Sequence, residues 1–192
     1  MKKILILNAH PRKDSFCRAL SESYRKGAVD SGADVKLINL IDLEFDPVLK
    51  THNTQSNDLE PDILKTQKEI SLADHLVFVY PNWWGTYPAL LKGFFDRVFT
   101  SGFAFKYQKH SRMPAKMLTG KSARVIVTMD TPLWYYSIGY KKPGHNSIKR
   151  SILGLCGISP VRITAFSPIR HSSPEKREMW LRKVERLGKA LS

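Results

Sequence analysis

Short apolar runs alternate with longer amphipathic segments along the whole chain, and this alternation limits the possible fold more than any other feature. Most of the runs are apolar at consecutive positions, which is typical of strands buried on both faces. Strands are expected at residues 2–8, 34–40, 75–80, 123–129 and 160–166. Helices are expected at residues 16–31, 61–73, 88–99, 145–156 and 174–191. The alternation predicts an α/β fold: a doubly wound parallel sheet of five strands with helices on both faces.

This expected sheet also predicts where the functional residues lie. Ligands of open parallel sheets bind outside the carboxyl ends of the strands. The segments that follow strands at that edge are residues 8–17, 81–87 and 128–145. A length of 192 residues is typical of one domain, so we expect residues 1–192 to form a single domain.

The charge of the chain is strongly basic and unevenly distributed. The 31 Lys and Arg residues exceed the 17 Asp and Glu residues, for a net charge of +14. Residues 1–100 are balanced, so the whole excess lies in residues 101–192, which hold only four acids. Charge alone leaves open a nucleic-acid, membrane-surface or anionic-ligand partner. No recognisable nucleic-acid-binding motif accompanies it, so no specific nucleic-acid binding is expected.

The cysteines and the apolar runs bear on the cellular compartment. Cys17 and Cys156 are isolated, which indicates neither a metal site nor a disulfide framework. The apolar run at residues 4–7 is too short for a secretory signal peptide. No run approaches the roughly 18 apolar residues of a membrane span. We therefore expect a cytoplasmic protein without a membrane span.

The first segment at the functional edge, residues 8–17, joins a strand to a helix and carries His10, Arg12 and Lys13. A helix N-terminus offers free N–H groups and a positive dipole end, which suit a phosphate. Ser15 is placed to cap that helix. Neither GxxxxGK nor GxGxxG is present. A phosphate site and a plain capped loop therefore both remain possible.

The other two segments are rich in aromatic residues. Trp83 and Trp84 lie between two prolines, where large rings can stack on a flat ligand while Asn82 reads its polar edge. The alternative is that one tryptophan caps the core and the other lies in an interface. Residues 128–136 are again aromatic and proline-stiffened, as a ligand site would be. The alternative is an irregular lid packed for dimer contact, and both interpretations can hold at once.

Several motifs together resemble a known family. They are Asn8-Ala9-His10-Pro11 with Ser15-Phe16, then Pro81-Asn82-Trp83-Trp84 followed by Pro88-Ala89-Leu90-Leu91-Lys92-Gly93, and further on Phe103-Ala104-Phe105 and Cys156-Gly157. The chain resembles the flavodoxin-like NAD(P)H:quinone oxidoreductases, in the branch of the bacterial NADPH-quinone reductases and potassium-efflux ancillary proteins. The resemblance covers nearly the whole chain. It implies the flavodoxin-like strand order 2-1-3-4-5.

The resemblance also implies a bound flavin, FMN or FAD, held by three loops. The phosphate would be held by His10, Ser15, Phe16 and Cys17, and the flavin ring by Pro81, Asn82, Trp83 and Trp84. The pyrimidine edge would be approached by Thr128, Met129, Asp130 and Thr131. Much of the family has a glycine-rich turn after the fourth strand, which this chain lacks. Tyr135, Tyr136 and His145 lie where catalytic donors to a quinone are expected.

The implied reaction passes two electrons from NADPH or NADH through the flavin to a quinone or another flat electron acceptor. The family usually forms a homodimer, and residues 134–140 are a candidate interface. The resemblance also admits a regulatory partner of a membrane transporter, and charge alone admits a non-enzymatic binder of anionic ligands or nucleic acid. Part of the excess positive charge lies near the expected pocket, on Lys141, Lys142, Lys149 and Arg150. Positive charge there would attract the additional phosphate of NADPH, so NADPH is favoured over NADH.

Overall fold

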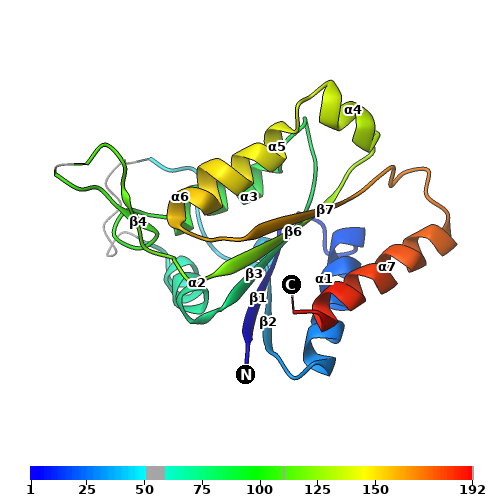
Figure 1. Ribbon diagram of the computed structural model, residues 1–192, viewed down its shortest axis with the longest axis horizontal. Coiled ribbons are helices and arrows are strands. Elements are labelled where there is room, and N and C mark those ends of the chain that lie inside the picture. Colours follow the sequence, from blue (N-terminus) through cyan, green and yellow to red (C-terminus); the bar gives the residue numbers. More distant parts are fainter. Residues whose placement is uncertain (51–58, 110, 192) are drawn as a thin grey trace.

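The protein is described by a computed structural model that covers residues 1–50, 59–109 and 111–191. Five parallel strands form its main sheet (Figure 1). In spatial order they are β2 (Asp34–Asn39), β1 (Lys3–Asn8), β3 (His75–Pro81), β6 (Ser122–Thr128) and β7 (Val161–Phe166). The sheet and its predicted strand order are confirmed. The three central strands are almost wholly buried, whereas β2 and β7 are partly exposed at the edges.

Helices cover both faces of the sheet and create two apolar cores. On one face, α1 (Phe16–Asp30) and α7 (Pro174–Lys189) lie side by side (Figure 1). Gly27 and Gly188 permit this contact, since a Cβ on either would lie 2.0–2.2 Å from a backbone oxygen of the other helix. The other face carries α2 (Pro61–Leu72), α3 (Ala89–Val98) and the helical segment 143–156.

Side chains of each strand alternate between these two cores. Leu5 and Leu7 of β1 pack in the core under α2 and α3, whereas Ile4 and Ile6 pack under α1 and α7. This alternation explains why the strands read as continuous apolar runs in the sequence. Among the described residues, no helix is long and apolar enough to cross a membrane.

The predicted helix at residues 145–156 is present, with an irregular centre. It consists of α5 (Pro143–Asn146), the π-helical turn η3 (Ser147–Leu153) and α6 (Gly154–Cys156). It ends at Gly157, which adopts a φ of +96° that favours glycine. The apolar periodicity of residues 145–156 gave no sign of the π-helical turn.

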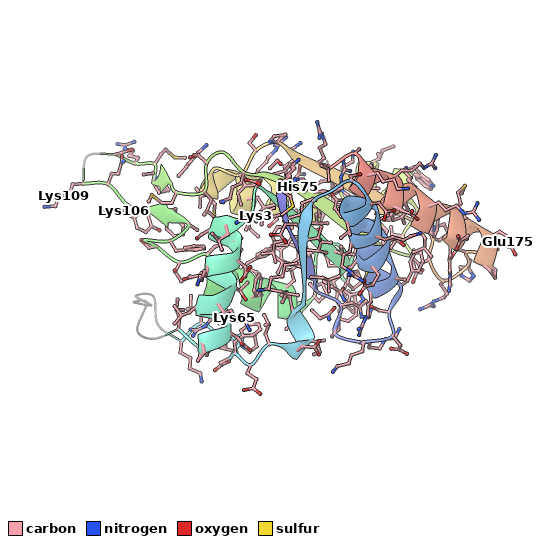
Figure 2. The ribbon with its side chains drawn as sticks, turned by 90° about the horizontal axis from the view of Figure 1, so that it is seen from below. Lys3, Lys65, His75, Lys106, Lys109 and Glu175 are labelled. Atoms are coloured by element: carbon pink, nitrogen blue, oxygen red, sulfur yellow. The ribbon has the colours of Figure 1, made fainter. Side chains whose placement is uncertain are left out.

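Smaller elements were not expected from the pattern. These are the short helix η1 (Leu40–Asp42), the helix α4 (Leu133–Ile138), and a hairpin of β4 (Phe105–Lys106) with β5 (Ala115–Lys116). Figure 2 shows Lys106 and Lys109 at one end of the molecule and Glu175 of α7 at the other. In the chain the hairpin lies between α3 and β6, and just after it the amide of Leu118 donates, at 2.9 Å, to the carbonyl of Cys156 at the end of α6.

Candidate functional site

The carboxyl ends of β1, β3 and β6 bring the three predicted segments together. In register, Asn8 lies opposite Val79, and Pro81 lies opposite Thr128. Beyond the strands, the amide of Asn82 donates to the carbonyl of Thr128 at 2.7 Å. The rings of His10 and Trp83 meet edge-to-face, with their centroids 6.0 Å apart. The loops after β1, β3 and β6 therefore form one contiguous surface.

The first loop ends at a capped helix N-terminus. Ser15 is the N-cap of α1, and its Oγ accepts a hydrogen bond from the amide of Arg18 at 3.3 Å. The Nδ1 atom of His10 accepts from the amide of Arg12 at 3.0 Å, and burial lowers the pKa of His10. Lys13 forms an ion pair with Asp42 at 3.0 Å. The loop can thus offer free amides and the Ser15 hydroxyl to an anion, beside a neutral His10.

Phe16 and Cys17 direct their side chains into the protein. The Cys17 thiol lies 3.3 Å from the Thr128 hydroxyl, and burial raises its pKa to about 12, so it is a neutral thiol. Phe16 packs against Trp180, with the Arg177 guanidinium over its ring. Any contact of Phe16 or Cys17 with a ligand phosphate would therefore come from the main chain of the first helical turn.

The second loop contains a tight turn that exposes a tryptophan. Trp83 and Thr86 form a bridge, and the two residues between them have φ values of 53° (Trp84) and 77° (Gly85). Positive φ at both central positions is the pattern of a type I′ turn. For a tryptophan this conformation costs about 1 kcal/mol. The turn holds the Trp84 side chain fully in solvent.

A cavity of about 480 Å³ opens beside this turn. Its lining residues come from the second and third segments: Asn82, Trp84, Gly85, Thr131, Tyr140 and Pro143. Ligand pockets for small molecules are commonly about 300–1,000 Å³, mostly apolar, with a few polar groups. An exposed indole, the Tyr140 ring, the Asn82 amide and the Thr131 hydroxyl fit a flat heteroaromatic ligand. The donor set therefore fits the ring of a flavin.

Tyr136 fastens the third segment to the second. Its buried hydroxyl donates to the carbonyl of Gly85 at 3.0 Å and accepts from the amide of Gly144 at 3.2 Å. Gly144 must lack a side chain, because a Cβ there would lie 2.9 Å from the Cα of Thr86. These contacts fix Pro143 and Tyr140 against the turn at Trp84.

The other two catalytic candidates lie on either side of Tyr136. The His145 ring meets the Tyr136 ring edge-to-face at 4.9 Å, and burial, followed by the charge of Lys142, lowers its pKa to about 4. Its buried Nε2 has no hydrogen-bond partner among the described residues. Tyr135 is exposed and contacts the ring of Tyr140. The catalytic roles of Tyr135, Tyr136 and His145 stay predictions.

The third loop is stiffened without the glycine-rich turn. Thr128 and Met129 are buried. Asp130 accepts from the amide of Arg170 at 2.7 Å, and the Ser167 hydroxyl donates to the carbonyl of Thr131 at 2.6 Å. The segment that follows β7 therefore supports this loop from outside the cavity.

The sequence interpretation missed three residues of the cavity lining. Gly85 belongs to the tryptophan segment but was not assigned a role, Tyr140 was assigned to the candidate interface, and Pro143 lies in the third segment without an assigned role. The sequence did carry a signal for the last two: Tyr140 ends an aromatic-rich stretch, and Pro143 follows it three residues later. No group of three or more potential metal ligands is found in the described part of the chain.

Comparisons with known proteins agree with this geometry. Residues 2–190 match the family with a flavodoxin-like fold. The structure is similar to Smu.1420 from Streptococcus mutans, with a TM-score of 0.86 and 34% identity over 98% of this chain and 99% of that one. It is also similar to an NAD(P)H:quinone oxidoreductase from Methanothermobacter marburgensis, with a TM-score of 0.80 and 25% identity over 99% and 96% of the two chains.

A curated relative points the same way. An uncharacterized NAD(P)H oxidoreductase from Haemophilus influenzae is 29% identical over 170 residues, which are 86% of this chain and 83% of that protein. The narrower branch suggested by the motifs stays a prediction. The wider resemblance is confirmed: the chain belongs to the flavodoxin-like family of NAD(P)H:quinone oxidoreductases.

Proposed function

We propose that this protein is a flavin-dependent NAD(P)H oxidoreductase that passes two electrons from NAD(P)H to a quinone or a similar flat acceptor. The observation that carries the proposal is the exposed Trp84 beside the cavity at the carboxyl edge of the sheet. An indole held in a strained turn, with no packing role of its own, suits contact with an aromatic ligand. The names of the relatives support the same reaction class.

The three loops divide the binding of a flavin among them. Its phosphate would meet the N-terminus of α1, with His10, the Ser15 hydroxyl, and the main chain of Phe16 and Cys17. Its ring would lie against Pro81, Asn82, Trp83 and Trp84, with residues 128–131 at the pyrimidine edge. Bound flavin would supply the redox chemistry, as an acceptor of hydride from the nicotinamide and a donor of two electrons to the acceptor. We favour FMN over FAD because the chain is short.

The residues around the cavity would bind and orient the two substrates in turn. Trp84 and Tyr140 offer aromatic walls for a flat acceptor. Tyr135 and His145 stay the candidate donors to the developing quinol oxygen, but neither is among the residues that line this cavity, and His145 lines the neighbouring groove beside β7. The Tyr136 hydroxyl, already bonded to Gly85 and Gly144, would act by positioning this wall.

We also propose that two copies associate through α4 and the residues that follow it. Trp134, Ile138 and Tyr140 are 67%, 75% and 45% exposed in the single chain. Exposed apolar residues this close together mark interaction surfaces. The homodimer is therefore a proposal from exposed apolar residues. A cytoplasmic location and a transporter partner are further proposals, carried over from the sequence.

A steady-state screen tests the proposed function. NADH and NADPH are offered with added FMN or FAD against a panel of quinones, azo dyes and nitroaromatics. Flavin-dependent oxidation of the nicotinamide, coupled to reduction of at least one acceptor, is expected. Absence of flavin-dependent oxidation with every acceptor would contradict the proposal.

A further inference from the structure

A second groove, of about 660 Å³, lies between the edge strand β7 and the helical segment that runs from α4 to η3. Its apolar floor includes Val161 and Ile163 of β7. Its rim carries four cationic side chains: Lys142, Lys149, Arg150 and Arg162. Among the lining residues that the structure describes there is no carboxylate. The groove therefore combines an apolar floor with an uncompensated positive rim.

The positive charge of the four rim cations is not offset by ion pairs of the described residues. None of them forms an ion pair within the part of the chain that the structure describes. On α7, by contrast, Arg182 pairs with Glu178, and Lys189 pairs with Glu185. Part of the excess positive charge of residues 101–192 therefore lies in this groove without ion-pair partners among the described residues. Such focusing of one sign of charge favours an anionic ligand.

The groove shares a wall with the candidate flavin cavity. Lys142 lines the groove, and the next residue, Pro143, lines the cavity. Lys142 adopts a φ of 53°, its amide donates to the carbonyl of Tyr136 at 3.1 Å, and its carbonyl accepts from the amide of Asn146 at 2.9 Å. A left-handed conformation at a lysine is strained and needs such support. The backbone therefore holds Lys142 at the boundary between the two hollows.

We infer that this groove binds the phosphorylated adenosine half of NADPH and makes the enzyme prefer NADPH to NADH. The inference rests on the proposed function. If the nicotinamide of NADPH lies in the flavin cavity, the adenosine half of the molecule can pass over the wall at Lys142 and reach the groove. NADPH carries a phosphomonoester where NADH carries a hydroxyl. Arginine forks and lysine ammonium groups bind such a phosphate by charge-assisted hydrogen bonds. The apolar floor would accept the adenosine.

The structure revises which cations take part. The sequence suggested Lys141, Lys142, Lys149 and Arg150. Lys141 does not line the groove, although it is exposed and has the same left-handed backbone as Lys142. Arg162, on the edge strand, lines it and was not suggested. Lys141 thus offers a matched control for Lys142.

The direct test is calorimetric titration of the FMN-supplemented protein with 2′-phospho-ADP-ribose and with ADP-ribose. These probes lack the nicotinamide, so the readout does not depend on activity. We expect the phosphorylated probe to bind at least about fivefold more tightly, as two or more partly exposed charge contacts would give. In the double variant Lys149→Gln/Arg150→Gln this ratio should fall toward one. The variant Arg182→Gln/Arg186→Gln, which removes two charges from α7, should keep it.

The lysine pair refines the test. Lys142→Gln should lower the ratio, whereas Lys141→Gln should lower it less. The ratio of kcat/KM for NADPH to that for NADH should fall in the same variants. The inference would be overturned if the wild-type protein bound both probes equally tightly. It would also be overturned if the ratio of the two probe affinities were the same in the groove variant as in the α7 variant. Preferential binding of the phosphorylated probe without flavin-dependent oxidation would instead contradict the proposed function.

Discussion

The hydroxyl of Tyr136 donates a hydrogen bond to the carbonyl oxygen of Gly85, 3.0 Å away and 51 positions earlier in the chain. The same oxygen of Tyr136 accepts from the amide of Gly144. One buried side chain thereby holds both walls of the candidate flavin cavity in a fixed relation. Functional sites need this kind of support from residues that do not touch the ligand.

Tyr136→Phe should lower the free energy of unfolding by about 1 kcal/mol, because it removes the hydroxyl that bonds both the Gly85 carbonyl and the Gly144 amide and leaves only their direct bond to each other, at 3.2 Å. It should also weaken flavin binding, since the contact between the turn at Trp84 and the segment at Pro143 loses both hydrogen bonds of the Tyr136 hydroxyl. Urea unfolding and flavin titration measure the two effects. Tyr135→Phe, at an exposed neighbour, should leave stability within about 0.5 kcal/mol of the wild type. Equal stability of the two variants would argue against the clamp.

Trp84→Ala should weaken flavin binding by about threefold to tenfold, which corresponds to the loss of one aromatic contact. Because the side chain is fully exposed, the free energy of unfolding should stay nearly unchanged. Tyr107→Ala removes an exposed aromatic ring that belongs neither to the cavity lining nor to the proposed interface, and it should leave the dissociation constant unchanged. If both variants bind flavin as the wild type does, Trp84 is not part of the site.

His75 should make the protein less stable in mild acid. It is buried against Tyr24, its Nδ1 lies 2.7 Å from the Ser122 hydroxyl, and burial lowers its pKa from 6.5 to about 4. As pH falls below 6.5, the unfolded chain binds the proton first, so stability present above pH 6.5 is lost progressively toward pH 4. For His75 alone the expected loss between pH 7 and pH 5 is about 2 kcal/mol.

The variant His75→Gln tests this titration, because it removes the ionisable ring and can keep a hydrogen bond to Ser122. Urea unfolding at pH 7 and pH 5 should show a smaller loss than in the wild type. A residual slope is expected from His145, whose pKa is also about 4. The control His171→Gln changes an exposed histidine and should keep the wild-type slope. An unchanged slope in His75→Gln would contradict the assignment.

Ile138→Glu should disrupt the proposed homodimer. The Ile138 side chain is 75% exposed in the single chain, so the charge should not disturb the fold. Sedimentation equilibrium should give twice the chain mass for the wild type and a single-chain mass for the variant. Met179→Glu, at an exposed apolar residue of α7, should sediment as the wild type. A wild-type protein that sediments as a single chain would rule out this interface.

The fold could be predicted because its signals are local and strong. The central strands are buried on both faces, so β1, β3 and β6 read as apolar runs, and Ser15 and Gly157 mark helix ends within one residue. The strand order followed from the resemblance. The two-residue strands β4 and β5 and the helix α4 could not be found, because they are too short to show a period. The π-helical turn η3 could not be predicted either, because the apolar period that indicates a helix is that of an α-helix, 3.6 residues per turn.

The candidate site could be predicted only at the level of segments. Polar and aromatic residues after β1, β3 and β6 pointed to the edge of the sheet where the structure brings the three loops together and where the cavity lies. The direction of each side chain depends on tertiary contacts, however. The Cys17 thiol turns toward Thr128, and the Tyr136 hydroxyl is taken by Gly85, because each is packed by residues more than 50 positions away. Tyr140 lies at the cavity because the Tyr136 hydroxyl holds its segment against the turn at Gly85, which is distant in the sequence.

A fluorescence titration of the wild-type protein with FMN, and with FAD in parallel, tests the central claim most directly. Trp83 and Trp84 lie at the proposed ring site, so their emission should be quenched on binding. We predict saturable quenching with one flavin per chain at micromolar concentration, with an affinity that is reduced in Trp84→Ala and unchanged in Tyr107→Ala. Absence of saturable binding of either flavin at micromolar concentration would contradict the account.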